Sequence, residues 1–289
     1  MFILSAFADE YDADIHLQIE GLKRCGISLI EPRGLFGKNI AEISLDEAKQ
    51  FKAILDENNV GVSAIGSPIG KIAIDAPMAP ELDRLRRVAQ IAHILDAKRI
   101  RMFSFFMEAK DAEANRSEVM RRMEQMIRVS EEENIFLCHE NEKGIYGDTP
   151  ERNMDLWREM GGKLALVYDP ANFNDIGVQA YPHAYEVMKD AVEYFHIKDS
   201  RGDCQFVPAG EGIGRIPELL EAITRDRAGK DVILTLEPHL KVFDGMAGLE
   251  QDMSKIHADQ TAYPDCHVAF CAASRALKKL IAKATDEKR

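Results

Sequence analysis

The chain of 289 residues has no excess of basic side chains and no long apolar run. Its 37 lysines and arginines are outnumbered by 49 aspartates and glutamates, which gives a formal net charge of −12. A protein that binds a nucleic-acid backbone needs a basic surface, so no nucleic-acid partner is expected. No segment approaches the roughly 18 uncharged apolar residues of a membrane-spanning helix. The N-terminal stretch MFILSAFADEYDAD has no basic region and soon reaches Asp9 and Glu10, so neither a signal peptide nor a membrane partner is expected.

Cysteine and glycine patterns argue against three further kinds of site. The five cysteines are scattered and form no CxxC pair, which argues against a disulfide framework and predicts a cytoplasmic protein. The first apolar run continues into LSAFADEY, which contains no glycine, so it lacks the fingerprint of a dinucleotide-binding turn. The run GEGIG at residues 210–214 resembles a phosphate cradle only superficially, because Glu211 would repel a phosphate and no strand directly precedes the run. We interpret it as a loop before a helix.

Strand and helix patterns alternate eight times along the chain. Short β-branched or aromatic runs predict strands at residues 2–7, 28–32, 62–66, 99–105, 135–140, 164–169, 192–197 and 232–237. Amphipathic stretches predict helices near residues 12–25, 44–58, 80–95, 113–133, 150–160, 181–190, 215–225 and 267–284. Eight such repeats predict a (β/α)8 TIM barrel that forms a single domain over residues 1–289, with an open doubly wound sheet as the alternative. Part of the long segment 239–266 is expected to form a short extra helix over the barrel mouth.

Four potential metal ligands stand at the C-terminal tips of the fifth to eighth predicted strands: Glu140, Asp169, His196 and Glu237. All strands of a closed parallel barrel end on the same face, so these side chains are expected to converge on one small volume. Three carboxylates in that volume would repel one another without a cation. This set of hard donors favours one Mn²⁺ or Mg²⁺ ion, with Co²⁺ or Zn²⁺ as alternatives. Taken singly, each carboxylate could instead be an ion-paired structural group, and His196 a hydrogen-bonded core histidine.

The strings CHENEKGIYGDTPE, YDPANF, FHIKDS, VPAGEGIG and LEPHL resemble the sugar isomerase/epimerase superfamily of xylose isomerase-like TIM barrels. This superfamily is related to tagatose and psicose epimerases and to endonuclease IV. The resemblance covers nearly the whole chain and implies that one divalent ion is held by Glu140, Asp169, His196 and Glu237. Asn172 and Tyr146 depart from the ketose epimerases, which carry histidine and glutamate at these positions. The extra histidines and the basic surface of endonuclease IV are not visible, which disfavours DNA repair.

Three residues near the strand tips are candidates to bind a sugar through charged groups. Lys198 lies on the same strand face as His196, so it could stabilise an oxyanion, or it could pair with Asp199 or Glu211. Glu31 and Arg33 share a face at the tip of the second predicted strand. They could bind hydroxyl groups, or they could form an ion pair with each other at the barrel rim.

Three more candidates for substrate binding are Asn172, His239 and His139. Asn172 could bind a hydroxyl group or could simply stabilise a turn. His239, two residues after Glu237, could reach the substrate or could be exposed to solvent. Strand alternation predicts that His139 faces the helices, although the twist of the strand end keeps it among the candidates.

The predicted activity is that of a metal-dependent isomerase or epimerase of a sugar or keto-sugar. An ion that chelates a carbonyl and its neighbouring hydroxyl acidifies the adjacent C–H group. Glu140 and Glu237, from opposite sides of the site, could then deprotonate the substrate and reprotonate the enediolate. The resemblance extends to sugar dehydratases and to C-glycoside-cleaving subunits that act on 3-keto sugars, so a lyase is the main alternative. A non-catalytic sugar-binding barrel is a lesser alternative, and members of the superfamily often form homo-oligomers.

Overall fold

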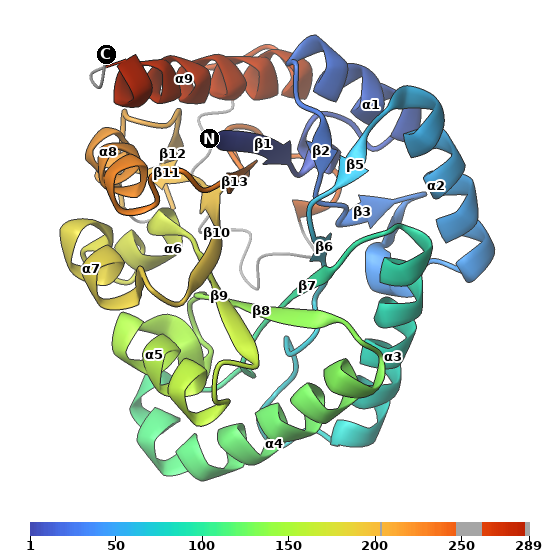
Figure 1. Cartoon of the computed structure of the whole chain (residues 1–289), viewed down its shortest axis with the longest axis vertical. Helices are drawn as coiled ribbons and strands as arrows, with labels where there is room; N and C mark the ends of the chain where they lie inside the picture. The colour runs from blue at the N-terminus through green and yellow to red at the C-terminus, as the bar shows by residue number, and fades with distance from the viewer. Residues whose placement is uncertain (203, 247–261, 287–289) are drawn as a thin grey trace.

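The computed structural model describes residues 1–202, 204–246 and 262–286 of the chain. Parallel strands form a central barrel, and the helices form a ring around it (Figure 1). The barrel strands are β1 (Phe2–Ala6), β2 (Leu29–Ile30), β5 (Gly61–Val62), β6 (Ile65–Gly66), β7 (Arg99–Met102), β8 (Phe136–Glu140), β9 (Leu164–Tyr168), β10 (Val192–Ile197) and β13 (Val232–Leu236). Each of the eight predicted strands overlaps one or two of these elements, which confirms the alternation read from the sequence.

The strands follow the order expected of a TIM barrel. Seven of them form one parallel sheet in the order β1-β13-β10-β9-β8-β7-β6. β5 and β6 are two short pieces of one strand position, and β5 pairs in parallel with β2. The backbone N–H of Glu31 donates to the carbonyl of Ala6 over 3.0 Å, which joins β2 to β1 and completes the ring. The (β/α)8 barrel is therefore confirmed.

The outer helices begin and end close to the predicted bounds. They are α1 (Ile15–Arg24), α2 (Leu45–Asn58), α3 (Met78–Ile94), α4 (Ala112–Glu132), α5 (Pro150–Glu159), α7 (Tyr185–Met188), α8 (Ile216–Asp226) and α9 (Cys266–Asp286). Helix α2 begins with a capping box, because Ser44 Oγ accepts from the backbone of Glu47 while the Glu47 carboxylate accepts from the backbone of Ser44. Helix α5 begins with the Thr149 hydroxyl as its cap and Pro150 in its first turn.

Several short elements line the mouth of the barrel, and the sequence patterns do not predict most of them. The helix predicted near residues 181–190 covers most of η5 (Ala180–Ala184) as well as α7. The elements that the patterns do not predict are η1 (Ala8–Glu10), β3 (Gly34–Leu35), β4 (Lys38–Asn39), η2 (Ile40–Glu42), η3 (Ala109–Asp111), η4 (Tyr146–Asp148), α6 (Pro170–Asn174), β11 (Asp199–Ser200) and β12 (Phe206–Val207). Each has at most five residues, which is too short for hydrophobic periodicity to register. The extra helix expected within 239–266 falls largely on residues 247–261, which lie outside the described part of the chain.

The barrel interior changes from apolar to polar along its axis. A small cluster of buried residues, formed by Ala64, Cys138, Ala165, Val167 and Tyr194, is separate from the main core between strands and helices. Cys138 is fully buried there, as the apolar strand around it predicts. The hydroxyl of Tyr194 donates to Glu31 over 2.9 Å, so this apolar cluster ends at a buried carboxylate. Charged side chains continue from that point toward the strand C-termini.

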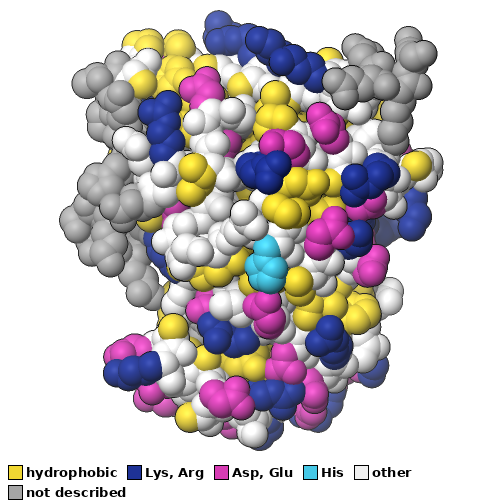
Figure 2. All heavy atoms as spheres, turned by 90° about the vertical axis from the view of Figure 1, so that its left-hand side faces the viewer, with side chains coloured by type: hydrophobic (Ala, Val, Ile, Leu, Met, Phe, Trp, Pro, Cys, Tyr) yellow, Lys and Arg dark blue, Asp and Glu magenta, His cyan; other side chains and the backbone are white. Residues whose placement is uncertain are grey.

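The outer helices carry mixed charge. On the face of α5, α7 and α8 shown in Figure 2, acidic and basic side chains lie close together, with apolar groups between them. Lys189 lies 2.7 Å from Glu186, and Arg225 lies 2.7 Å from Asp226. This face therefore shows no continuous basic surface of the kind that binds nucleic acids. Among the described residues, no helix combines the length and the apolar character needed to cross a bilayer.

Replacing Ser44 with alanine is expected to destabilise the protein by about 1 kcal/mol, because the cap of α2 is lost while the site is untouched. In thermal unfolding this should lower Tm by roughly 2–4 °C. Ser117→Ala, at an exposed position inside α4, is the matched control and should not lower Tm. Equal Tm values for Ser44→Ala and wild type would contradict the capping role.

Candidate metal centre

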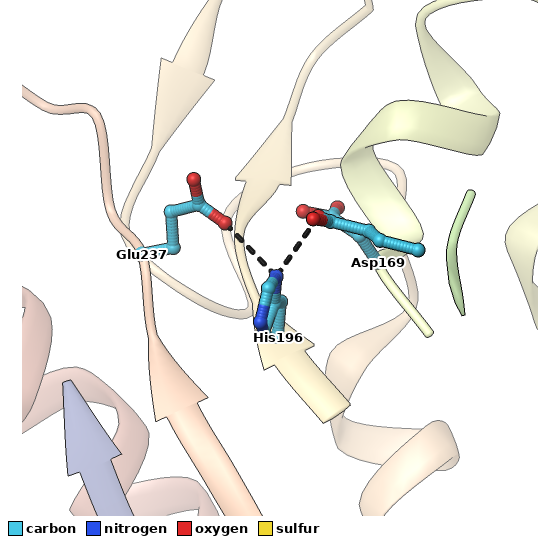
Figure 3. A group of neighbouring side chains, drawn as sticks. Asp169, His196 and Glu237 are labelled. Carbon is cyan, nitrogen blue, oxygen red and sulfur yellow. Dashed lines mark hydrogen bonds and ion pairs between the residues drawn. The ribbon is translucent and has the colours of Figure 1, made fainter. Parts of the chain in front are cut away.

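Four strand ends bring the predicted metal ligands together. Glu140 ends β8, Asp169 follows β9, His196 lies in β10 and Glu237 follows β13. One potential ligand atom from each residue lies within 4.8 Å of the others, and all four side chains are buried. In Figure 3, Asp169, His196 and Glu237 point toward one common space. The convergence expected from the barrel topology is therefore present.

Two carboxylate oxygens in this cluster accept no hydrogen bond from the described part of the chain. Asp169 Oδ1 caps α6 by accepting from the backbone N–H groups of Ala171 and Asn172, which leaves Oδ2 turned inward. Asp169 Oδ2 and Glu237 Oε2 are buried and accept no hydrogen bond from any residue that the structure describes. Burial raises the pKa of Asp169 to about 7 although Lys198 opposes the shift. A buried carboxylate oxygen without a hydrogen bond is costly, and a divalent cation would satisfy both atoms.

His196 stands at the centre of the acidic cluster. Its Nδ1 lies 2.9 Å from Glu140 Oε1 and 3.2 Å from Glu237 Oε2, and its Nε2 lies 3.4 Å from Glu31. Burial disfavours a charged imidazole, but the Glu140 and Glu31 carboxylates outweigh burial and raise the pKa of His196 well above its ordinary value. The surroundings of Nδ1 thus stabilise a positive charge, which fits a cation at this position.

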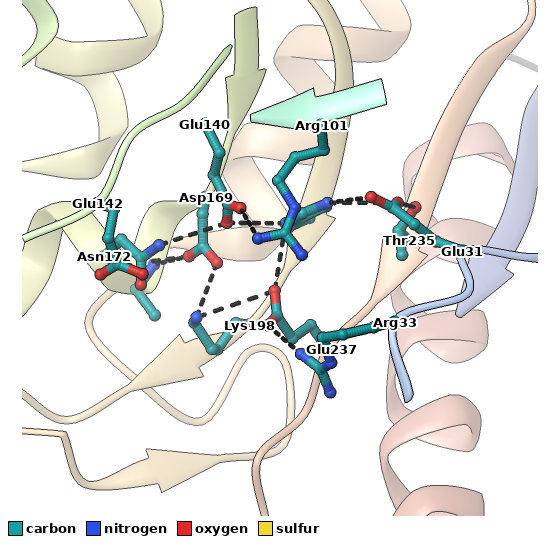
Figure 4. Close-up of polar contacts among 12 residues, drawn as sticks. Glu31, Arg33, Arg101, Glu140, Glu142, Asp169, Asn172, Lys198, Thr235 and Glu237 are labelled. Carbon is teal, nitrogen blue, oxygen red and sulfur yellow. Dashed lines mark hydrogen bonds and ion pairs between the residues drawn. The ribbon is translucent and has the colours of Figure 1, made fainter. Parts of the chain in front are cut away.

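Glu31 lies behind His196 and is fully enclosed. It accepts hydrogen bonds from the hydroxyls of Tyr194 and Thr235, each over 2.9 Å. Figure 4 shows Glu31 beside Thr235. A side chain with no exposed surface cannot meet a substrate, so the predicted contact of Glu31 with sugar hydroxyls is not supported. A carboxylate that accepts from the outer nitrogen of a ligand histidine fixes the ring and its tautomer. Glu31 is placed for that role.

Arg33 does not pair with Glu31, which corrects the predicted alternative. Its guanidinium donates to Asp9 Oδ2 and to Glu237 Oε1, each over 2.9 Å, and to Glu10 Oε1 over 3.3 Å. Burial raises the pKa of Glu10 to about 8 although Arg33 opposes the shift. Arg33 also lines a cavity of about 330 Å³ beside Asp9 and Gly34. Its hydrogen bond nevertheless orients Glu237, which keeps its second oxygen for the cluster.

Arg101, Asp9 and Glu10 are functional candidates that the sequence reasoning did not identify. Arg101 Nη1 lies 3.2 Å from Glu140 Oε2, and the ring of Phe7 lies near the guanidinium groups of both Arg33 and Arg101, 4.3 Å and 5.5 Å away. The signals in the sequence are an arginine within the apolar strand RIRM and two acids directly after the first strand. Each of these residues also has an ordinary interpretation as a surface charge.

Lys198 faces the cluster, as predicted from its position two residues after His196. Its Nζ lies 3.0 Å from Asp169 Oδ2, in an ion pair without hydrogen-bond geometry, and 3.9 Å from Glu237 Oε2. Burial opposes the charged form, but Asp169 and Glu237 outweigh burial and raise the pKa of Lys198 well above its ordinary value. Neither predicted alternative partner is found among its ion pairs, which join it to these two carboxylates.

Asn172 lies in α6 beside the cluster. Its Nδ2 donates to the carbonyl of Asn141 over 2.9 Å and to Glu140 Oε1 over 3.4 Å. Asn172 therefore contacts the candidate ligand Glu140. It lies in α6, whose N-terminus is capped by the candidate ligand Asp169.

His239 also reaches the cluster rather than solvent. Its Nε2 lies 3.3 Å from Glu237 Oε1 and 3.4 Å from Glu10 Oε1, and neither ring nitrogen has a hydrogen-bond partner among the described residues. Burial lowers its pKa to about 4, so the ring is neutral near pH 7. Glu10, Glu237 and His239 could form a second small cation site, but Arg33 already supplies a positive charge to both carboxylates.

His139 is not part of the cluster. Its Nδ1 lies 2.9 Å from Asn153 Oδ1, and its Nε2 lies 2.9 Å from Ser104 Oγ. Because the amide nitrogen of Asn153 donates to two carbonyls, its oxygen is the acceptor, and His139 donates from Nδ1. Strand alternation turns His139 away from the mouth while Glu140 faces it, so the predicted substrate contact is not supported.

Comparisons with known proteins agree with the barrel fold. Residues 19–256 match the family model described as the xylose isomerase-like TIM barrel. Of the solved structures, D-allulose 3-epimerase from Methylomonas sp. in complex with D-allulose is 15% identical, with a TM-score of 0.73 and 96% of each chain covered. A probable 3-DHS dehydratase, AsbF from Bacillus anthracis, is also 15% identical, with a TM-score of 0.72, 96% of this chain covered and 98% of its own.

A third similar structure contains a metal. The IOLI protein with a bound zinc atom is 13% identical, with a TM-score of 0.71, 98% of this chain covered and 99% of its own. At these identities the likeness concerns the fold alone. No curated protein matches the sequence significantly.

The pH dependence of stability should report the burial of His139. Burial lowers its pKa from 6.5 to about 4, so between these values the unfolded chain binds more protons than the folded one. The stability that this neutral histidine contributes is complete above pH 6.5 and is lost as the pH falls toward 4. His139→Gln should reduce this dependence by up to about 1.4 kcal/mol per pH unit, measured by urea unfolding at several pH values. The exposed His16→Gln is the control, and an unchanged slope in His139→Gln would contradict the assignment.

Proposed function

The chain belongs to the xylose isomerase-like TIM barrel family, and from this premise we propose that it is a divalent-metal-dependent isomerase or epimerase of a sugar or keto-sugar. The reaction passes through an enediolate. One observation carries the proposal: four buried ligand atoms lie within 4.8 Å of one another, and two inward carboxylate oxygens accept no hydrogen bond from the described residues. An inert sugar-binding barrel would have no need of such a costly arrangement.

Glu140, Asp169, His196 and Glu237 would hold one divalent ion. Such an ion polarises a carbonyl and acidifies the neighbouring C–H group. Three carboxylates and one imidazole favour Mn²⁺ or Mg²⁺, and the zinc atom in a similar structure keeps Zn²⁺ as an alternative. Glu31 would orient the imidazole of His196 from behind.

Glu140 and Glu237 are the proposed acid and base. They approach His196 Nδ1 from β8 and β13, which lie on opposite sides of β10 in the sheet order β13-β10-β9-β8. Each glutamate has one oxygen in the cluster and the other beside a buried arginine, Arg101 or Arg33. Two carboxylates on different sides of a bound substrate can serve the two faces of one carbon, which epimerisation requires.

Lys198, Asn172 and His239 are the proposed substrate contacts. The Lys198 ammonium beside Asp169 can stabilise charge that develops on a substrate oxygen. The neutral ring of His239 has no hydrogen-bond partner on either nitrogen among the described residues, so it can bind a hydroxyl group. Arg33 contributes indirectly by holding Glu237, and the enclosed Glu31 and the outward-facing His139 are not proposed as contacts.

A lyase is the second candidate. The similarity to the probable 3-DHS dehydratase is as close as that to the D-allulose epimerase. A lyase must also protonate a leaving group, and His239 lies beside Glu237 with no hydrogen bond to its ring nitrogens from the described residues. Both reactions begin with removal of a proton next to a carbonyl, so the same two glutamates would serve either one.

The acid/base assignment is tested with the variants Glu140→Gln and Glu237→Gln, assayed at saturating Mn²⁺. Deuterium exchange from D₂O into D-allulose and other ketohexoses is expected to fall by roughly 10²–10⁴-fold in each variant, because the proton-transferring group is lost. Metal content is measured in the same samples, so that loss of the ion is distinguished from loss of the base.

The surface variant Glu131→Gln is the control and should keep wild-type exchange. Full exchange in both site variants with metal bound would exclude the assignment. Exchange accompanied by loss of water or of an aglycone would identify a lyase, and metal binding without any exchange would indicate a pure binder.

Replacing Glu31 with glutamine tests the metal centre apart from turnover. The variant keeps an acceptor for one of the two hydroxyls, offers an amide donor to the other, and removes the charge behind His196, so metal affinity should fall by roughly 10–100-fold in calorimetric titration. Glu193→Gln is the matched control, because Glu193 belongs to the same strand as His196 but pairs with Arg99 on a more exposed surface. Equal metal affinities in the two variants would contradict the role of Glu31.

A further inference from the structure

The loop after the seventh strand position offers backbone N–H groups to an anion, and the chain itself supplies that anion. In TIM barrels, phosphate groups frequently bind at the loops after the seventh and eighth strands. Here the backbone N–H groups of Gly210 and Gly212 donate to Asp199 Oδ2 over 2.8 and 3.1 Å, and those of Gly214 and Ser200 donate to Asp199 Oδ1 over 3.0 Å. The cradle that the glycine spacing suggests is therefore occupied by an internal carboxylate.

The glycines are required by this close approach. A Cβ atom at residue 212 would lie 2.3 Å from Asp199 Oδ1, and one at residue 214 would lie 2.7 Å from the same oxygen. Asp199 itself is buried, with 1% of its surface exposed. The loop 210–214 is thus built around an aspartate that follows Lys198, and its N–H groups in these bonds are not directed at the barrel mouth.

The cationic side chains around the candidate metal centre are likewise engaged by carboxylates. Lys198 lies 3.0 Å from Asp169, Arg101 3.2 Å from Glu140, and Arg33 2.9 Å from both Asp9 and Glu237. On the opposite rim, Lys71 lies 3.3 Å from Glu142 and over the ring of Phe103 (Figure 4 shows Glu142 beside Asn172). An anionic group that binds to any of these cations would have to compete with the carboxylate already paired to it.

Carboxylates outnumber cationic side chains among the described residues around the candidate metal centre. The seven carboxylates are Asp9, Glu10, Glu31, Glu140, Glu142, Asp169 and Glu237, and the five cations are Arg33, Lys71, Arg101, Lys143 and Lys198. Even with His196 counted as a cation, the positive groups do not outnumber the carboxylates.

We propose that the substrate is an uncharged polyhydroxylated carbonyl compound and that phosphorylated sugars and sugar acids are rejected. This proposal rests on the proposed isomerase or epimerase function and specifies its substrate class. A phosphate or carboxylate would bring negative charge into a buried site that is lined by carboxylates and in which Lys198, Arg101 and Arg33 are already paired with them. A neutral sugar needs only chelation and hydroxyl contacts, which the cluster, Asn172 and His239 can provide.

The test compares matched pairs of ligands on the manganese-loaded protein. D-Allulose is compared with D-allulose 6-phosphate, and D-fructose with D-fructose 6-phosphate, by calorimetric titration and by deuterium exchange from D₂O. The neutral member of each pair is expected to bind and exchange at least 10²-fold better. Equal or better binding of a phosphorylated member would overturn the proposal. If a neutral sugar binds but takes up no deuterium, the proposed reaction is excluded. The binding data still show whether the site prefers the neutral or the phosphorylated member of each pair.

Inorganic phosphate gives a measurement that does not depend on the choice of sugar. Wild-type protein is expected to show no phosphate-dependent rise in Tm at millimolar concentrations, whereas Asp199→Ala should gain one because its vacated N–H groups can hold the anion. Asp199→Asn, which keeps an acceptor in the cradle, is the matched control. Millimolar phosphate binding by the wild type would overturn the proposal, and this outcome is readable even if Asp199→Ala does not fold.

Discussion

Mutual repulsion among three buried carboxylates is the constraint on which the rest of the site depends. Glu140, Asp169 and Glu237 are held close together by strand ends that the barrel places side by side, and moving them apart would mean opening the sheet. Like charges at such distances in a buried volume must be compensated. The compensation is divided: Arg33 and Arg101 take the outward oxygens of the two glutamates, His196 and Lys198 lie beside the inward ones, and two inward oxygens still accept no hydrogen bond from the described residues.

The interior of the barrel supports this arrangement from below. The apolar cluster around Cys138 and Ala165 ends at Tyr194, whose hydroxyl holds Glu31, and Glu31 in turn faces the outer nitrogen of His196. Each residue in this series of contacts is buried. The orientation of the His196 ring is therefore fixed by rigid packing rather than by a loop. The loops complete the mouth around this rigid base. α6 fixes one oxygen of Asp169, and the loop 210–214 secures Asp199 beside Lys198.

The barrel fold and the four candidate metal ligands could be predicted from the sequence, because both depend on patterns within short segments. The eight strand and helix patterns have clear periodicity, and residues at parallel strand tips must share one face, so the amino-acid sequence alone groups Glu140, Asp169, His196 and Glu237. The ion-pair and hydrogen-bond partners of the buried polar side chains could not be predicted. Proximity in the sequence favours a pair between Arg33 and Glu31, whereas Arg33 contacts Glu237, 204 residues away. Arg101 gives only the signal of an arginine within a strand, and the role of His139 depends on Ser104 and Asn153, which surround its ring.

The pairing of cations with carboxylates in the site also limits which interactions can bind a substrate. Because the surrounding cations are bound to carboxylates, little charge attraction is left for recognition, and a neutral substrate must gain its binding from chelation and from hydroxyl contacts. Under the proposed function, metal binding and substrate binding would be inseparable, since the ion would supply both affinity and activation. Specificity among neutral sugars would rest on uncharged donors and acceptors such as His239 and Asn172. In this arrangement, a change in sugar specificity would require substitutions only among the residues that line the mouth. The four candidate ligands and the contacts behind His196 could remain the same.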